Sequence, residues 1–190
     1  MRRFTVLFAL VLAFGAFAMA QMEPKPMEIP RTEFFLGYAY QHADVSGSNI
    51  VDSASMNGFD FQFSHYFKSN FGFTMDLSHT SNSKVDSTGI KYSRSSYMLG
   101  PSFRLHAIKM FTPSVHALAG VDHDDLTEPF SNTNIDYRNT DFAAAAGVAF
   151  DANLSRHLAV RVAQVDYVYT HHFSTNQSSF RYAGGVVARF

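Results

Sequence analysis

The sequence predicts an all-β fold, an eight-stranded antiparallel up-and-down transmembrane β-barrel. Three observations support this prediction. The chain of 190 residues opens with the pattern of an export signal. Eight later segments alternate apolar and polar residues with a period of two, which is typical of strands with two unlike faces. The connections between these segments alternate between short and long, as in a meander of up-and-down strands.

Residues 1–20 are predicted to be a signal peptide. Two arginines precede an apolar run over residues 4–17, and the small-residue cleavage site "AMA" ends at Ala20. A transmembrane helix is the alternative, but the run is too short to cross roughly 30 Å of hydrocarbon comfortably. We therefore expect a mature chain that begins at Gln21.

Composition excludes several classes of protein. The chain has no cysteine, which excludes a disulfide framework, a cysteine metal site and a lipid anchor on an N-terminal cysteine. Without the two signal-peptide arginines, 13 basic residues stand against 16 acidic ones, so nucleic acid is not an expected partner. The chain contains 20 Phe and 9 Tyr, yet no segment after the signal reaches 18 consecutive apolar residues. Any membrane crossing therefore has to use strands.

Residues 21–31 are predicted to be a proline-rich leader, because its three prolines cannot pair inside a sheet. The barrel is predicted over residues 32–190. Its alternating runs cover residues 33–41, 59–67, 71–78, 96–105, 115–122, 142–150, 158–170 and 180–190. The connections "FKSN", "HAIKMFT" and "DANLSRH" are short. Four polar connections are predicted as external loops: "ADVSGSNIVDSAS", "SNSKVDSTGIKYS", "DDLTEPFSNTNIDYRNT" and "HHFSTNQS".

The seventh run has a conflict of phase. If Gln164 and Asp166 face the polar side, Tyr167 and Tyr169 face outward, but Arg161 is turned outward too. Either a bulge between Arg161 and Gln164 or a position of Arg161 at the membrane rim would resolve the conflict.

The apolar face is predicted to contact lipid. Its Phe and Tyr side chains would overfill the interior of an eight-stranded barrel, which is only wide enough for side chains to pack. In the alternative, a water-soluble barrel such as a lipocalin, the apolar face points inward. Glycines that suit a crowded lumen lie on the polar face: Gly37, Gly72, Gly100, Gly120, Gly147 and Gly185.

The signal peptide, the eight runs and the segments "LAVRVAQVDYVYT" and "FRYAGGVVARF" resemble the OmpA-type family of small outer-membrane barrels over residues 32–190. The resemblance implies a monomer in the cell outer membrane, surrounded by its lipids and lipopolysaccharide and delivered by periplasmic chaperones and the barrel-assembly machinery. In that family a terminal aromatic residue after alternating apolar positions is an insertion signal, here Tyr182, Val186, Ala188 and Phe190. Because the chain stops after the eighth run, no peptidoglycan-binding domain is expected.

The polar face predicts a network of charges inside the lumen: Glu33, Asp60, Asp76, Arg104, Asp122, Asp166, Arg181 and Arg189. In a narrow bore such charges pair and plug the barrel. The pattern indicates a non-enzymatic protein for envelope integrity, surface interaction or adhesion. A narrow pore for small solutes is the alternative.

Two lumen contacts follow from the order of the strands. The "KSN" turn places Asp60 roughly opposite Asp76, so either Arg104 or another arginine has to reach between them, or one carboxyl has to hold a proton. Closure of the barrel pairs Glu33 with Arg189, in a part-hydrated ion pair worth at most about 1 kcal/mol.

The sequence predicts neither a cofactor nor a metal site, because the adjacent His171 and His172 point to opposite faces of a strand. The stretch "SHTSNS" resembles the H-x-S-N stretch of lipid A deacylases of the PagL type. His79 and Ser81 share one face of a strand, as a base and a nucleophile must, and the next acid downstream is Asp86. Lipid A deacylation is therefore the third functional hypothesis.

Overall fold

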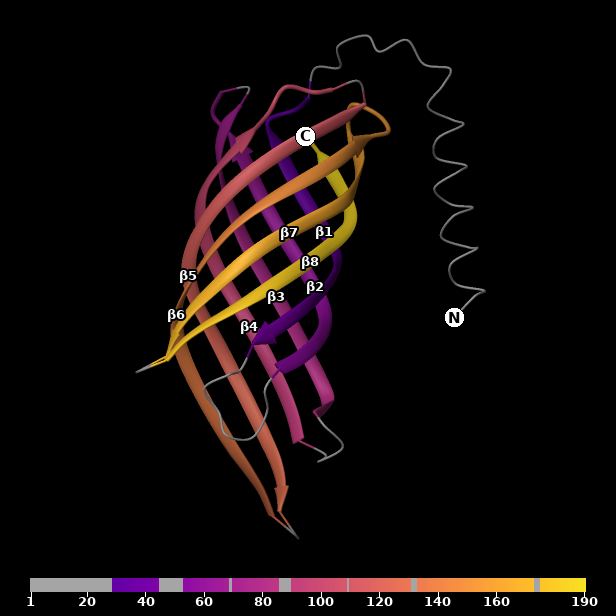
Figure 1. Cartoon of the computed structure of the whole chain (residues 1–190). Helices are drawn as coiled ribbons and strands as arrows, with labels where there is room; N and C mark the ends of the chain where they lie inside the picture. Colours follow the sequence, from indigo (N-terminus) through magenta and orange to yellow (C-terminus); the bar gives the residue numbers. More distant parts are fainter. Residues whose placement is uncertain are drawn as a thin grey trace, which may run out of the picture.

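The computed structural model describes residues 29–44, 53–68, 70–85, 90–108, 110–130, 133–172 and 175–190. Eight strands form one closed antiparallel barrel, in which each strand pairs with its neighbours in the chain and β1 pairs with β8 (Figure 1). The predicted fold class is confirmed. The predicted signal peptide and residues 21–28 of the predicted leader lie outside the described residues. The strands are β1 (Thr32–Asp44), β2 (Ser53–Tyr66), β3 (Phe71–Val85), β4 (Ile90–Arg104), β5 (Phe111–Phe130), β6 (Thr133–Asn153), β7 (Leu158–His172) and β8 (Thr175–Arg189).

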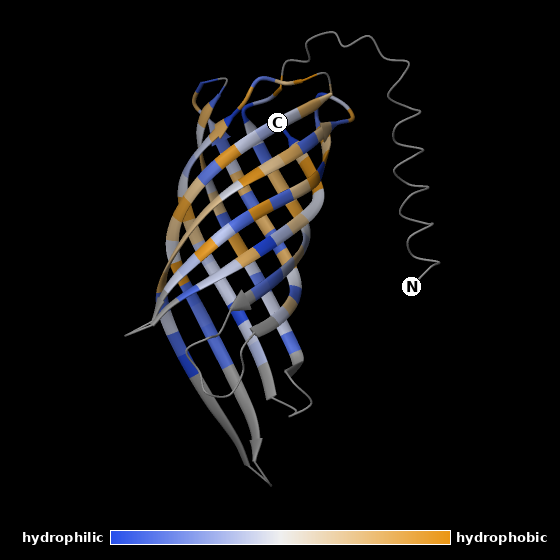
Figure 2. Ribbon diagram, in the orientation of Figure 1, coloured by the Kyte–Doolittle hydropathy of each residue, from blue (hydrophilic) through white to orange (hydrophobic). Residues whose placement is uncertain are grey.

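The two faces of the wall follow the alternation of the sequence. Large apolar side chains such as Leu36, Phe73 and Leu99 stand on the outside, where Phe73 is 44% exposed. Hydrophobic residues are spread over the barrel wall in Figure 2, whereas the projecting part of β5 and β6 is hydrophilic where it is coloured. The described residues include no helical segment with the length and hydrophobicity that a transmembrane helix requires. The closed ladder pairs the backbone groups of the wall with one another, which hydrocarbon demands.

The seam lies between β1 and β8, where Glu33 is opposite Arg189, as predicted. Next to that pair, Thr32 and Phe190 exchange both of their backbone hydrogen bonds, at 3.1 and 2.9 Å. The connections that follow β2, β4 and β6 are short and lie at this same end of the barrel. In the outer-membrane barrels that the sequence resembles, the short turns face the periplasm, so the opposite end is the one expected to be external.

β7 contains the predicted bulge. Its register to β8 shifts between Arg161 and Gln164, and its register to β6 shifts at Phe150 and Asp151. Because the bulge resets the alternation, both Arg161 and Gln164 are buried inside the barrel while Val162 lies outside. The other predicted solution, with Arg161 at the membrane rim, is wrong.

β5 and β6 are longer than predicted. The sequence predicts a loop over "DDLTEPFSNTNIDYRNT", residues 124–140, but the β5–β6 ladder continues into this segment as far as the pair Phe130 and Thr133. The resulting hairpin projects beyond the other strands (Figure 1). The loop prediction failed because the sequence loses its apolar alternation there, whereas the backbone ladder does not need it.

Candidate functional site

The lumen is the most highly charged interior region of the described residues. The side chains of all eight predicted lumen residues lie inside the wall and are buried: Glu33, Asp60, Asp76, Arg104, Asp122, Asp166, Arg181 and Arg189. Five further ionisable residues join them, which the predicted network did not include: Arg94, His116, Asp124, Asp151 and Arg161. Arg94, His116, Asp124 and Asp151 have the inward phase of their strands, so extending the alternation would have found them. Arg161 is reached only through the bulge.

At the seam end of the lumen, Glu33 lies between two arginines. The Arg189 Nε atom is 2.6 Å from Glu33 Oε1, and the Arg104 Nη2 atom is 2.8 Å from the same oxygen. Arg189 also contacts Asp151 at 3.1 Å. The predicted Glu33–Arg189 pair is confirmed, but its predicted partial hydration is wrong, since Arg189 is 0% and Glu33 3% exposed.

Arg104 closes this end of the lumen. Its guanidinium group lies 3.9 Å from the centre of the Tyr66 ring and donates to the backbone oxygen of Pro30 at 3.3 Å. The segment that leads into β1 therefore helps to cover the Glu33 cluster, which explains why water is excluded from the ion pair.

At mid-barrel the predicted register of β2 and β3 is wrong by two residues. Gln62 rather than Asp60 lies opposite Asp76, and Asp60 lies opposite Ser78. Of the arginines that the prediction allowed, Arg181 and not Arg104 reaches the mid-barrel carboxylates, and the two that it contacts are those of Asp76 and Asp166. Its Nη1 and Nη2 atoms lie 2.9 and 2.8 Å from the two oxygens of Asp76, and its Nε and Nη2 atoms lie 3.0 and 2.8 Å from Asp166 Oδ2.

Arg161 links the mid-barrel cluster to the seam cluster. Its Nε atom lies 2.8 Å from Asp151 Oδ1, and its guanidinium carbon lies 4.4 Å from the centre of the Phe35 ring. Its Nη1 atom donates to the side-chain oxygens of Gln62 and Gln164, at 2.7 and 2.8 Å. Because the oxygens of both glutamines accept from Arg161, their amide nitrogens can donate to aspartates, Gln62 to Asp76 and Gln164 to Asp166.

Toward the external end, Arg94 continues the network. Its Nε atom lies 2.7 Å from Asp124 Oδ1 and 3.8 Å from Asp122 Oδ2. One of its terminal nitrogens donates to Gln177 Oε1 at 2.9 Å, while Thr170 donates to Asp122 at 3.0 Å. Charged contacts thus occur along the lumen from the seam end to the base of the β5–β6 hairpin.

One glycine is required by this packing. His116 Nε2 lies 2.9 Å from Asp166 Oδ1, and the pair crosses directly over Gly147. A Cβ atom at Gly147 would lie 1.9 Å from that Asp166 oxygen and 2.7 Å from the His116 nitrogen. No side chain larger than hydrogen fits there without moving the pair.

The residues of the predicted insertion signal run from the middle of β8 to the residue that follows it. Tyr182, Val186 and Phe190 are exposed on the outer surface, and the Phe190 ring meets the Phe34 ring edge-on at 5.9 Å. Ala188 is partly exposed. Recognition of these residues by an insertion machinery stays a prediction.

The side chains around His79 differ from the arrangement that the deacylase hypothesis expects. His79 and Ser81 do share the outer face of β3, but the His79 Nδ1 atom lies 2.9 Å from the hydroxyl of Ser95 on β4. Asp86 and the side chains of His171 and His172 lie outside the described part of the chain. The histidine therefore has a serine neighbour, but it is not the serine of the sequence motif.

Comparison with known proteins finds a matching family model and several solved barrels of similar fold. A family model described as outer membrane protein beta-barrel domain matches residues 6–190. No curated protein matches the chain. Ail, the attachment invasion locus protein of Yersinia pestis, shares 18% identity over 84% of this chain and 99% of its own, with a TM-score of 0.63. The Neisserial surface protein A, NspA, shares 14% over 84% and 97%, with a TM-score of 0.64. OprG from Pseudomonas aeruginosa shares 12% over 87% and 99%, with a TM-score of 0.54.

Proposed function

The chain belongs to the outer membrane protein β-barrel domain family, and from that premise we propose that it is a non-enzymatic surface protein whose closed barrel holds a β-hairpin out from the cell for interaction with other molecules. The hairpin is the projecting part of β5 and β6. Adhesion or attachment is the kind of role that this arrangement serves.

The observation that carries the proposal is a free strand edge. The β6–β7 ladder ends at Phe142 and His171, whereas the β5–β6 ladder continues to Phe130 and Thr133. Among the described strands, residues 133–138 of β6 therefore have a ladder partner on β5 only. An unpaired edge offers a row of backbone donors and acceptors to which an extended peptide can add as a further strand.

The charge of the hairpin favours a basic partner. Residues 125–138 contain three acidic residues and one basic residue, Arg138. A partner strand that carries Lys or Arg would therefore gain electrostatic attraction as well as backbone hydrogen bonds. The relatives are described as an attachment protein and a surface protein. One Ail structure holds a heparin analogue, sucrose octasulfate, but an acidic hairpin does not suit so anionic a ligand.

The contents of the lumen support a plugged barrel over a narrow pore. Buried arginines cross the bore at three levels, through Arg189 and Arg104, Arg161 and Arg181, and Arg94. An eight-stranded barrel has room for little besides side chains, so paired charges at three levels favour a bore that side chains close. A closed and rigid barrel is what a fixed support for the hairpin requires.

Export and assembly complete the proposal. Residues 1–20 would be removed on export, and periplasmic chaperones and the barrel-assembly machinery would deliver the chain, with the latter reading Tyr182, Val186, Ala188 and Phe190. The mature protein would be a monomer among outer-membrane lipids and lipopolysaccharide. The outward aromatic face and the seam at Phe190 support this placement.

Binding of a synthetic strand tests the proposal. The probe is a fluorescent decapeptide of alternating Lys and Val, and its control has the same number of lysines but proline in place of valine, so it has few backbone donors. The protein is held in lipid nanodiscs, and binding is read by fluorescence anisotropy. We expect the first peptide to bind and the second to bind at least tenfold more weakly. Equal binding of the two would show attraction by charge alone and would contradict an edge site.

A hairpin variant locates the site on the protein. Leu126 and Tyr137 are cross-strand partners, so replacing residues 127–136 with Asn-Gly closes the hairpin with a two-residue turn and removes most of the free edge. This variant should lose the peptide and should also lower adhesion of cells that carry it. A matched variant, Asp125→Asn with Glu128→Gln and Asp136→Asn, keeps the edge and should retain weakened, less salt-sensitive binding. Undiminished binding by the shortened variant would rule out the hairpin.

A further inference from the structure

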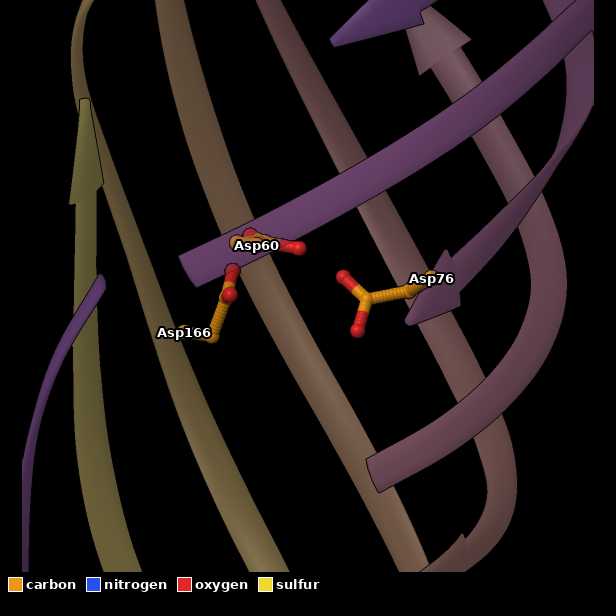
Figure 3. Close-up of side chains that lie close together, drawn as sticks. All are labelled: Asp60, Asp76 and Asp166. Carbon is orange, nitrogen blue, oxygen red and sulfur yellow. The ribbon is translucent and has the colours of Figure 1, made fainter. Parts of the chain in front are cut away.

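We propose that the centre of the lumen binds one calcium ion through the carboxylates of Asp60, Asp76 and Asp166. The three residues come from β2, β3 and β7, and the sequence does not reveal that they meet. One oxygen from each lies within 4.8 Å of the others, and all three side chains are 0% exposed. In Figure 3 the carboxyl group of Asp60 points toward Asp76, with the carboxyl group of Asp166 close beside it.

Asp60 is the residue that points to a missing ligand. Its Oδ1 atom is buried and has no hydrogen-bond partner. Its Oδ2 atom accepts only two long bonds, from the amides of Gln62 at 3.3 Å and Gln164 at 3.4 Å. A buried carboxylate oxygen without a partner costs free energy, and ordinarily such a group is paired or bound to a cation.

The other two carboxylates of the cluster already have protein donors, and the Oδ1 atom of each has a single such contact. Asp76 receives two bonds from Arg181 and one from Gln62 at 2.7 Å. Asp166 receives bonds from Arg181, from Gln164 at 2.8 Å and from His116. Asp60 therefore remains the one carboxylate of the three that these donors do not satisfy.

The local charge also favours a cation. Three carboxylates face one arginine, Arg181, within the cluster. Arg161 pairs with Asp151 and reaches the aspartates only through the amides of Gln62 and Gln164. If the three carboxylates are ionised, Arg181 leaves two negative charges, and a divalent cation balances them.

The donor set selects calcium among divalent ions. The chain has no cysteine, and His116, the histidine that touches the cluster, already contacts Asp166. Carboxylate oxygens favour hard cations over transition metals. Calcium accepts irregular sets of oxygen ligands at about 2.3–2.6 Å, whereas magnesium demands an octahedron and keeps several waters, which a packed lumen does not provide. Repulsion from Arg181 lowers the affinity, so we expect a Kd of roughly 0.1–1 mM, as in extracellular calcium modules.

Refolding with and without calcium tests the site. The protein is purified from outer membranes in detergent, unfolded in urea, and refolded either with EDTA or with calcium in roughly hundredfold excess over that Kd. Calcium should raise the Tm of the wild type by about 5–10 °C, the shift expected for a ligand at that excess on a protein of this size. Asp60→Asn should remove the shift, because it removes the unsatisfied charge. Asp125→Asn, which changes a carboxylate that is 41% exposed outside the cluster, should retain it.

A second measurement, of calcium stoichiometry, distinguishes a bound ion from a proton on Asp60. Equilibrium dialysis with radioactive calcium should give one ion per wild-type barrel and none per Asp60→Asn barrel. A calcium shift that persists in Asp60→Asn, or no shift in the wild type, would overturn the proposal. A Tm that rises on acidification in EDTA but not with calcium would show a proton on Asp60 in place of a metal ion, and would equally overturn it. If Asp60→Asn does not refold, the wild-type stoichiometry decides. None of these results depends on whether the hairpin binds a strand.

Discussion

Arg189 fastens the last strand of the barrel to the first through Glu33, with 2.6 Å between Arg189 Nε and Glu33 Oε1 and with both side chains buried. Arg104 and Asp151 complete the group. Because the pair is shielded from water, breaking it leaves a buried charge without its partner, which is far more costly than losing an exposed pair.

A double-mutant cycle at the seam measures this cost. Glu33→Gln is expected to lower the free energy of unfolding by about 3–5 kcal/mol, because Arg104 and Arg189 both lose a partner. Adding Arg189→Gln to Glu33→Gln should cost much less than Arg189→Gln costs alone. Urea titration of the refolded barrel gives the values. Strictly additive costs would mean that the two residues do not interact.

An exposed ion pair of the same barrel provides the control. Asp125 and Arg138 lie 3.1 Å apart on the hairpin, but they are 41% and 73% exposed. Replacing either charged residue with a neutral amide, Asp125→Asn or Arg138→Gln, should lower the free energy of unfolding by at most about 1 kcal/mol. A cost equal to that at the seam would show that burial is not the cause.

Glycine at position 147 is expected to be essential for the His116–Asp166 contact. Gly147→Ala places a Cβ atom where Asp166 Oδ1 lies, so it should lower the free energy of unfolding by about 1–3 kcal/mol. Gly184→Ala is the matched control, since the nearest atom to a Cβ there is 3.4 Å away, and it should be neutral or slightly stabilising. Equal losses for the two variants would point to a general effect of removing glycine from a strand.

The outward face is expected to lie in hydrocarbon. Phe61→Arg, in the interior of β2, should cost about 2–4 kcal/mol of folding free energy in lipid vesicles, and Phe73→Arg, two residues from the start of β3, should cost less. Ser53→Arg, at the external start of β2, should cost much less. Folding efficiency is read from the shift in gel mobility between folded and unfolded barrels. If the arginine variants fold as well as the wild type, the aromatic face does not meet the membrane core.

The fold could be predicted because lipid and lumen impose opposite demands on alternate residues. That signal ends where the membrane ends, which is why residues 124–140 are predicted as a loop although the β5–β6 ladder continues as far as Phe130 and Thr133. The inward position of Asp60, Asp76 and Arg181 could be predicted from phase alone. The contact between Arg181 and Asp76 could not, because it depends on the stagger of β8 and β3, which are not neighbours in the chain.

Two further features of the lumen depend on local exceptions. Arg161 enters the lumen only because β7 bulges, and the sequence predicted that bulge without predicting that Arg161 would bond Gln62 on the far wall. Phe35 is an aromatic residue on the polar face, where it fills the lumen beneath Arg161. Neither contact has a signature in the spacing of the residues.

Loss of the outer histidine is expected to leave lipid A intact. His79 contacts Ser95 rather than Ser81, so His79→Ala should not change the mass of lipid A extracted from cells that carry the protein. The wild type and Ser81→Ala serve as references. A deacylated product that is present with the wild type and lost in His79→Ala would establish lipid A deacylase activity and would contradict a non-enzymatic protein.

Conductance most directly tests the claim that the barrel is a closed support and not a channel. The wild-type protein is inserted into planar lipid bilayers and its current is recorded at fixed voltage, beside Arg94→Gln, which alters the external level of the charge network. The lumen packing predicts no stepwise current for the wild type. Discrete, ohmic channels in the wild type, with a unit conductance that Arg94→Gln changes, would show that solutes pass through the lumen and would contradict the closed support.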